Sequence, residues 1–189
     1  MGTFLEGLGC CLIRMDELGH QALEPGGVAY QDVIGEFGDE VGDGLVDSAG
    51  RINRRALGAY VFAHPDRLEQ LNALIHPAVR ARGKTLAEAF ALQHPDGIAV
   101  TEAAILIETG SYKSYDRLVV AVCRPEQQIE RAMRRDGLTR EEVLDRLSRQ
   151  IPLDAKRKYA DYVIDTSGSK EETLAQTRAV YDSLRSLKL

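Results

Sequence analysis

The chain has 189 residues, of which 44% are hydrophobic and 28% charged, a balance typical of a globular protein rather than a disordered or fibrous one. Its length suits a single core that carries an insertion, and its net charge of −5 gives no general reason to bind nucleic acid or an anionic membrane. No stretch approaches the roughly 20 apolar residues of a membrane span, and the N-terminus lacks the pattern of a secretory signal, so we expect a cytoplasmic protein.

The N-terminal region predicts a short helix followed by a buried strand. Residues 2–9 have helical spacing of apolar side chains, and Cys10–Ile13 is the kind of short apolar run found in parallel strands. Asp16 follows this strand at its carboxyl end. Open α/β sheets bind ligands outside the carboxyl ends of their strands, so Asp16 is a candidate site residue.

Residues 16–93 have a helical pattern with breaks at 24–27 and 42–44, and we expect no strand within them. This segment is the candidate insertion. Strands are predicted again at 97–106, 117–123 and 162–165, with helices between them. The alternation predicts an α/β fold in which a mostly parallel sheet has helices on both faces.

The segment 131–158 is basic, with nine Lys or Arg against five Asp or Glu, whereas the rest of the chain holds 15 against 24. A helix is predicted from Pro125 to Arg135, and Thr139–Glu142 reads as a capping box that starts a second helix. Seven of the nine basic residues are Arg, which binds phosphate oxygens through a planar guanidinium. The alternative is a solvated helical surface. An amphipathic helix is predicted after residues 167–169.

An Arg-rich helical hairpin beside a parallel sheet resembles the lid of a nucleoside-monophosphate-kinase-like phosphotransferase, with Arg131, Arg135 and Arg146 as the candidates to contact phosphate. Several motifs, in their order and spacing, extend the resemblance to nearly the whole chain and to one family, the dephospho-CoA kinases of the P-loop kinase superfamily. These motifs are Leu12–His20, Glu24–Gly26, Phe37–Gly38, Gly50–Leu57, Val61–Ala63, Leu74–Pro77, Glu102–Gly110, Arg131–Thr139, Arg146–Gln150 and Ala160–Gly168.

The resemblance implies transfer of the ATP γ-phosphoryl group to the ribose 3′-hydroxyl of dephospho-CoA, the final step of coenzyme A synthesis, with Mg²⁺. It also implies that the chain is divided into a core, an insertion and a lid. Residues 1–36, 96–125 and 159–189 would form the α/β core, residues 37–95 a helical CoA-binding insertion, and residues 126–158 the lid. A third possibility is another nucleoside or nucleotide kinase, which would share the lid and the sheet. The motifs of the helical insertion fit that possibility less well.

The resemblance further assigns roles to residues. Asp16 would accept or orient the proton of the attacking hydroxyl, with Arg131 and Arg135 at the transferring phosphoryl group. Arg146 would contact ATP, and Glu102 could hold Mg²⁺ through water. Arg54, His76 and Arg80 fall in the segment implied to bind dephospho-CoA. Structural roles remain open: a helix cap for Asp16, a helix partner for Glu102 and a core histidine for His76.

His20, His64 and His94 lack metal-ligand spacing, and no protein metal site is expected.

The family begins with a strand and a phosphate loop of the form GxxxxGK[ST], and this sequence contains no such motif. Gly83-Lys84-Thr85 matches its last three positions, but residue 78 is Ala and the triplet lies inside a helical pattern. Either the true start lies upstream or the protein is a truncated relative. We favour the first explanation, because the candidate carboxylates and lid arginines are retained.

The missing strand and phosphate loop lead to two expectations for this chain. The first core strand is absent, which leaves two neighbouring strands without a partner, and kinase activity should be low because the loop supplies much of the phosphate binding. The alternative function is a non-catalytic relative that binds dephospho-CoA or CoA. Arg14 stands where the family commonly has an acidic residue, and it could pair with Asp16 or point toward phosphate.

Overall fold

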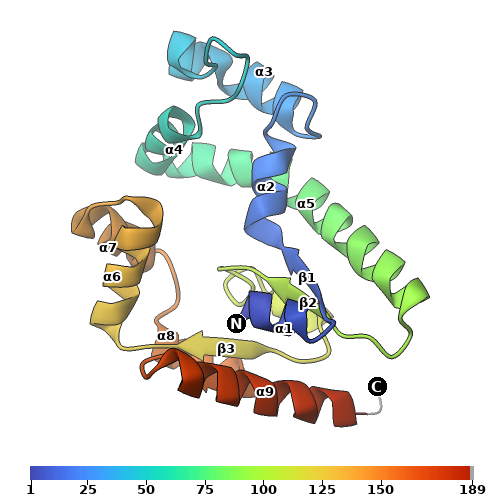
Figure 1. The fold of residues 1–189 in the computed structure, drawn as a ribbon. Coiled ribbons are helices and arrows are strands. Elements are labelled where there is room, and N and C mark those ends of the chain that lie inside the picture. Colours follow the sequence, from blue (N-terminus) through green and yellow to red (C-terminus); the bar gives the residue numbers. More distant parts are fainter. Residues whose placement is uncertain (188–189) are drawn as a thin grey trace. The chain divides into compact units, whose positions relative to one another are not determined.

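A computed structural model describes residues 1–187, and the chain divides into two compact units. The first unit is Gly9–Ala103, and the second combines Met1–Leu8 with the chain from Ala104 onward. Figure 1 labels the elements of both. The helical segment 37–95 lies wholly in the first unit and the segment 126–158 wholly in the second. Their functions as insertion and lid stay predictions.

A pair of parallel strands forms the base of the first unit. β1 (Cys11–Arg14) pairs with β2 (Ala99–Glu102) in a register that runs from Cys11↔Ala99 to Arg14↔Glu102. Ile13, at the centre of β1, is 3% exposed and anchors the strand in the core. Helix α2 (Met15–Ala22) begins as β1 ends, so the predicted strand and its polar carboxyl end are confirmed.

The rest of the first unit is helical, as the sequence predicts. It contains α3 (Tyr30–Val41), the 3₁₀ turn η1 (Gly42–Gly44), α4 (Arg54–Ala63) and the long α5 (Pro65–Gln93). The break at Gly42 has a φ of 69°, which favours glycine. Apart from one isolated bridge between Val46 and Ile52, the described residues between 16 and 93 form no strand. The helices bury one core, whose most enclosed side chains are Val33, Phe37, Leu45, Leu57 and Val61.

Gly83 lies where α5 packs against β1. A Cβ atom at this position would lie 3.0 Å from Met15 Sδ, so the Met15 side chain would have to shift, and 3.7 Å from Ile13 Cγ2, an ordinary contact distance. The Gly83-Lys84-Thr85 triplet is therefore part of a packed helix, as expected from the sequence.

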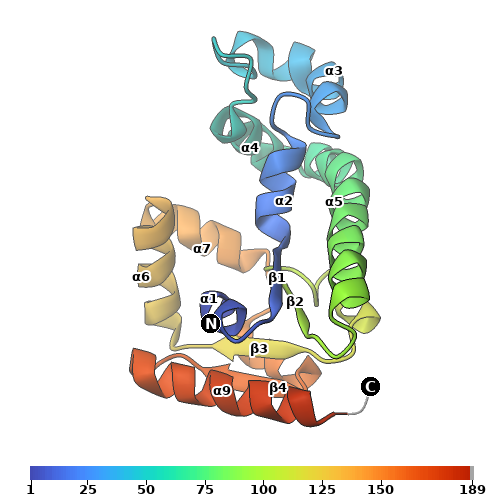
Figure 2. The same cartoon turned by 45° about the vertical axis from the view of Figure 1, so that its right-hand side comes forward.

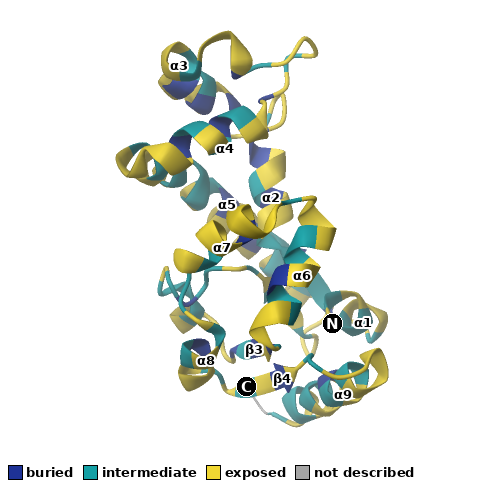
Figure 3. Cartoon of the chain, turned by 90° about the vertical axis from the view of Figure 1, so that its left-hand side faces the viewer, coloured by how far each residue is buried: buried dark blue, intermediate teal, exposed yellow. Residues whose placement is uncertain are grey.

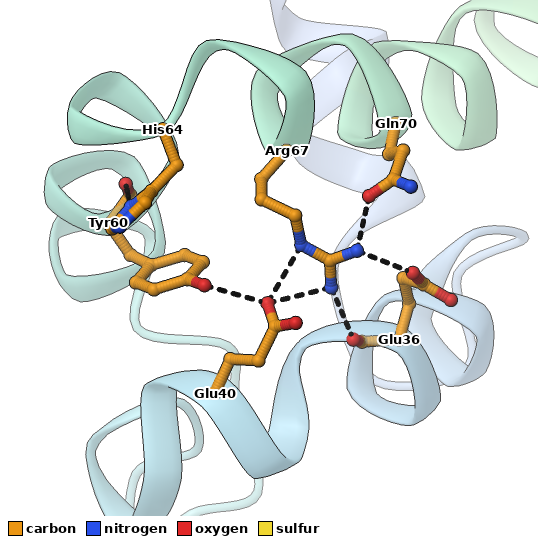
Figure 4. A network of polar contacts seen from close by, with 6 residues as sticks. All are labelled: Glu36, Glu40, Tyr60, His64, Arg67 and Gln70. Carbon is orange, nitrogen blue, oxygen red and sulfur yellow. Dashed lines mark hydrogen bonds and ion pairs between the residues drawn. The ribbon is translucent and has the colours of Figure 1, made fainter.

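Arg67 joins α5 to α3 through a polar network (Figure 4). Its side chain is 18% exposed, with Nη1 2.8 Å from Glu36 Oε1 and Nη2 2.7 Å from Glu40 Oε2. Nη2 also donates to the Glu36 carbonyl at 2.9 Å, and the guanidinium lies 4.7 Å from the centre of the buried Phe37 ring. Tyr60 donates to Glu40, and this hydrogen bond raises the pKa of Tyr60. One side chain thus connects a hydrophobic core residue to two carboxylates on α3.

We predict that Arg67→Met lowers the urea midpoint of the first unit clearly more than the control Lys84→Met. Lys84, on the same helix, makes one exposed ion pair with Glu88 at 3.6 Å, and such pairs contribute little. Arg67→Lys should recover only part of the loss, because an ammonium cannot reproduce the planar fork. Equal midpoints for Arg67→Met and Lys84→Met in circular dichroism would contradict this.

The second unit has its own parallel pair, β3 (Val119–Val122) and β4 (Tyr162–Asp165). Helix α9 (Lys170–Ser186) packs along this pair, as Figure 2 shows, and starts at a complete capping box between Ser169 and Glu172. The short α1 (Gly2–Gly7) is attached to α9, because Tyr181 donates to the Leu8 carbonyl at 3.1 Å. The predicted strands at 117–123 and 162–165 and the final helix are confirmed.

The predicted hairpin is also present in the second unit. Helix α6 (Pro125–Asp136) ends at Gly137, whose φ is 67°, and Thr139 and Glu142 form both halves of the capping box that begins α7 (Arg140–Ser148). Figure 3 shows that most of α7 is exposed. Three short elements complete the unit: η2 (Ser111–Ser114), α8 (Leu153–Lys156) and η3 (Arg157–Tyr159).

Within the described part of the chain, the four strands form two parallel pairs rather than one continuous sheet. Parallel pairing is as predicted. One predicted boundary is wrong, because the strand expected at 97–106 ends at Glu102. Residues beyond it turn back on themselves, with Thr109 N donating to the Ile105 carbonyl and Gly110 N to that of Ile107.

Candidate functional site

Two candidate carboxylates lie at the carboxyl ends of the paired strands of the first unit. Asp16 is the second residue of α2, directly after β1, and Glu102 is the last residue of β2. Both side chains are exposed. Asp16 lies in the first turn of its helix, where the helix dipole favours a negative charge. The strand register brings together the two strand ends that carry these residues.

Arg14 stands beside these carboxylates. Its Nε atom is 3.6 Å from Glu17 Oε1 and 3.9 Å from Glu102 Oε2, and its side chain is 31% exposed. Arg14 and Glu102 are register partners across β1 and β2, so the strand pairing itself creates the second contact. The sequence left the direction of Arg14 open. The structure places it against Glu102, at the same strand ends as Asp16.

The three candidate arginines of the hairpin have different surroundings. Arg131 on α6 donates to Thr166 Oγ1 at 3.0 Å and to the Thr166 carbonyl at 2.9 Å. Arg135 Nε lies 2.7 Å from Asp136 Oδ1, and Arg146 Nη1 lies 3.8 Å from Asp136 Oδ2. The hydrogen bond from Arg135 is the main cause that lowers the pKa of Asp136. The structure therefore groups Arg135 and Arg146 around one carboxylate and turns Arg131 toward the segment after β4.

A charged pair fastens the two hairpin helices to each other. Arg140 at the start of α7 donates to both oxygens of Glu126 on α6, at 2.9 and 3.0 Å. Such two-point contact fixes direction as well as distance. The hydrogen bonds from Arg140 lower the pKa of Glu126, so the carboxylate stays charged at neutral pH. No sequence pattern distinguishes this pair from the other charges of the hairpin.

The residues expected to bind dephospho-CoA all lie in the first unit. Arg54 is exposed at the first position of α4, where the Asn53 side chain caps the helix by accepting from Ala56 N at 3.1 Å. His76 and Arg80 are one turn apart on α5. Burial and then the charge of Arg80 lower the pKa of His76, so its imidazole is neutral at pH 7. The structure brings His76 and Arg80 together and leaves Arg54 on the neighbouring helix.

Sequence reasoning missed a buried ion pair in the second unit. Lys156 Nζ lies 2.7 Å from Glu108 Oε1, with side chains 10% and 16% exposed. The sequence signal was present, since Glu108 directly follows the apolar run Ile105–Ile107. A charged residue at the end of such a run has to find a partner if it is buried.

Comparison with known proteins identifies the family. A sequence model of the dephospho-CoA kinase family matches residues 1–172. The chain belongs to the dephospho-CoA kinase family. A dephospho-CoA kinase of Geobacter metallireducens is 39% identical over 183 residues, which cover 96% of this chain and 88% of that protein. One from Aquifex aeolicus is 37% identical over 177 residues, which cover 94% and 86%.

Solved structures agree with this membership. The crystal structure of TT1252 from Thermus thermophilus matches with a TM-score of 0.78 and 31% identity, over 96% of this chain and 88% of that one. A dephospho-CoA kinase from Campylobacter jejuni matches with a TM-score of 0.65 and 26% identity, over 97% and 90%. The α/β fold and phosphotransferase class predicted for the chain are thereby confirmed.

Among the described residues no helix is long and apolar enough to cross a membrane. In the same residues, no three His, Cys, Asp or Glu side chains gather as they would for a metal held by protein alone.

We predict that Arg80→Ala raises the pKa of His76. The cation disfavours a second positive charge one helical turn away, so its removal lets the imidazole protonate at higher pH. Burial is the larger cause and remains, so the pKa should still lie below the ordinary 6.5. NMR titration of the His76 ring protons measures this, with Arg82→Ala as control. Identical His76 titrations in wild type and Arg80→Ala would contradict the prediction.

Proposed function

We propose that the protein transfers the γ-phosphoryl group of ATP to the ribose 3′-hydroxyl of dephospho-CoA. The observation that carries this proposal is the placement of Asp16 and Glu102 at the carboxyl ends of two adjacent parallel strands, in a chain that belongs to this kinase family. Ligands of open α/β sheets bind at such ends. The two substrates, dephospho-CoA and ATP, are small molecules, and we expect the reaction to take place in the cytoplasm.

Asp16 is the proposed catalytic base. It is exposed at the start of α2, so its carboxylate is free to meet a substrate hydroxyl, accept a hydrogen bond from it and take its proton as the bond to phosphorus forms. Phosphoryl transfer needs little covalent help from the protein, and positioning of the attacking oxygen is therefore a major part of the contribution.

The two carboxylates also fit Mg²⁺. This ion is commonly held by one or two protein carboxylates together with phosphate oxygens and water, and Asp16 and Glu102 provide such a set at the strand ends. When bound, Mg²⁺ neutralises charge on the phosphates. Arg14, 3.9 Å from Glu102 Oε2, would share that carboxylate with the ion. We propose Glu102 as the residue that holds Mg²⁺ through water.

The hairpin arginines are proposed to neutralise the phosphates. Arg131, Arg135 and Arg146 are exposed, so a phosphate can reach them without unfolding of the hairpin. Arg135 and Arg146 share one carboxylate, Asp136, which keeps both guanidinium groups near the hairpin turn. In the same proposal Arg131 and Arg135 contact the transferring group and Arg146 contacts ATP, while Arg54, His76 and Arg80 bind the acceptor.

We predict that Asp16→Asn lowers the rate of CoA formation by about 100-fold or more, because the amide cannot accept the proton. The rate is measured in single turnovers with the protein in excess over radiolabelled ATP, which detects slow transfer. Asp32→Asn, an exposed aspartate in the first turn of α3, serves as the matched control and should stay within about twofold. Equal rates for Asp16→Asn and wild type would refute the role of Asp16.

We also predict that the 189-residue chain forms CoA slowly and binds ATP weakly while it binds dephospho-CoA. No GxxxxGK[ST] segment is present in these residues to surround the ATP phosphates with backbone N–H groups and a lysine. Calorimetry with each substrate alone tests this, and tight ATP binding would contradict it. Dephospho-CoA binding without any transfer that depends on Asp16 would instead support a non-catalytic CoA-binding relative.

A further inference from the structure

The buried ion pair of Glu108 and Lys156 joins the segment after β2 to helix α8 within the second unit. Glu108 lies in the turns after β2, and Lys156 ends α8, which follows the hairpin. Besides its contact with Glu108 at 2.7 Å, Lys156 Nζ donates to the Ala104 carbonyl at 3.0 Å. Glu108 Oε1 also accepts from the backbone N–H of Ile151 at 3.0 Å. Ile151 is the third residue after α7 ends.

The contacts of Glu108 are one-sided. Oε1 accepts both hydrogen bonds, whereas Oε2 is buried without a hydrogen-bond partner within the part of the chain that the structure describes. Burial raises the pKa of Glu108, but hydrogen bonds from Lys156, from the backbone N–H of Glu108 itself and from Ile151 outweigh it and hold the pKa below its ordinary value. The carboxylate is therefore charged at neutral pH and only half satisfied.

Such a pair is a poor choice for stability alone. Burying two charges costs free energy that their attraction often fails to recover, and an unpaired buried oxygen adds to the cost. Apolar side chains of similar volume are commonly as stable or more so. What they cannot supply is an acceptor for the Ile151 N–H and a donor for the Ala104 carbonyl.

The other end of the hairpin is fixed separately. Gln127 Nε2 donates to the Ser167 carbonyl at 3.0 Å, Arg124 N donates to Ser167 Oγ at 3.1 Å, and Arg131 donates to Thr166. Helix α6 is thus held by the segment after β4, and α7 leads into a connection held by Glu108. The hairpin is thus attached near the start of α6 to the segment after β4, and after α7 to the buried carboxylate of Glu108.

We propose that Glu108, together with Lys156, is a positioning residue that fixes the C-terminal attachment of the hairpin bearing Arg131, Arg135 and Arg146. The proposal rests on the proposed function in one respect, that these arginines act on phosphate. Glu108 itself touches no reacting atom. It acts through Ile151, because the N–H it accepts from lies where the chain leaves α7.

The test removes the charges together and keeps the volume. Glu108→Leu combined with Lys156→Met should fold, with a melting temperature close to wild type. Hydrogen exchange of the amides in 138–152 should become at least about tenfold faster, since the attachment opens locally, while exchange in α9 stays unchanged. The matched control is Arg178→Met combined with Asp182→Leu, which removes an exposed pair of 3.1 Å on α9 and should leave hairpin exchange unchanged.

A second variant distinguishes the effect of the lost hydrogen bond to Ile151 from the effect of the lost charges. Glu108→Gln combined with Lys156→Met keeps an oxygen that can accept from Ile151 N–H but has no charge. It should return exchange at Ile151 to within about threefold of wild type, because the acceptor is restored. The proposal is overturned if hairpin exchange is unchanged in the Leu/Met variant, if it rises equally in α9, or if the Gln/Met variant gives no recovery.

An activity measurement then links the attachment to catalysis. In single turnovers the Leu/Met variant should show a transfer rate at least about tenfold lower, with the dephospho-CoA concentration for half-maximal rate within about twofold of wild type. An unchanged rate despite faster hairpin exchange would overturn the positioning role. Absence of transfer by wild type would refute the proposed function instead, and the exchange comparison would still decide whether Glu108 holds the hairpin.

Discussion

The parallel register of β1 on β2 is the constraint on which the candidate site depends. It sets Arg14 opposite Glu102 and ends both strands at the same level, so that α2, with Asp16 as its second residue, starts where β2 also ends. A slip of one residue would turn Ile13 out of the core and move Glu102 away from Arg14. The core contacts that bury Ile13 therefore also fix the place of the carboxylates. The same strand register thus satisfies both the packing of the core and the geometry of the candidate site.

Charge pairing in the hairpin serves a different purpose from burial. Arg135, Arg146 and Arg140 all pair with carboxylates at exposed positions, where such contacts contribute little to the free energy of folding. These ion pairs instead restrict the position of each long arginine side chain, at a small cost in free energy. A phosphate with more negative charge than Asp136 could draw Arg135 and Arg146 toward itself without loss of the fold. Exposed, weakly held arginines suit a group that has to exchange partners during a reaction.

The sequence predicted the elements of the fold well wherever local signals decide them. The capping box of Thr139 and Glu142, the strand that precedes Asp16 and the strand that ends at Asp165 follow from short-range chemistry, and the structure confirms these features. The end of β2 was missed because Ala103–Ile107 is apolar enough to continue a strand, and only turn hydrogen bonds formed in the folded chain stop it. The direction of Arg14 and the pair of Glu108 with Lys156 were also beyond reach, because each depends on partners brought close by tertiary structure. The assigned roles of Asp16, Glu102 and the arginines came from the family resemblance, and they stay proposals.

Gly83-Lys84-Thr85 shows why a motif needs its structural context. In a phosphate loop these residue types stand between a strand and a helix, where several backbone N–H groups lack partners and can bind phosphate oxygens. Here they lie in the middle of α5, whose N–H groups are already engaged within the helix. Gly83 is small because α5 packs on Met15 and Ile13, and Lys84 pairs with Glu88 one turn on. The same three residue types thus serve helix packing in this protein, and the candidate phosphate-binding groups are the side chains of the hairpin rather than this backbone.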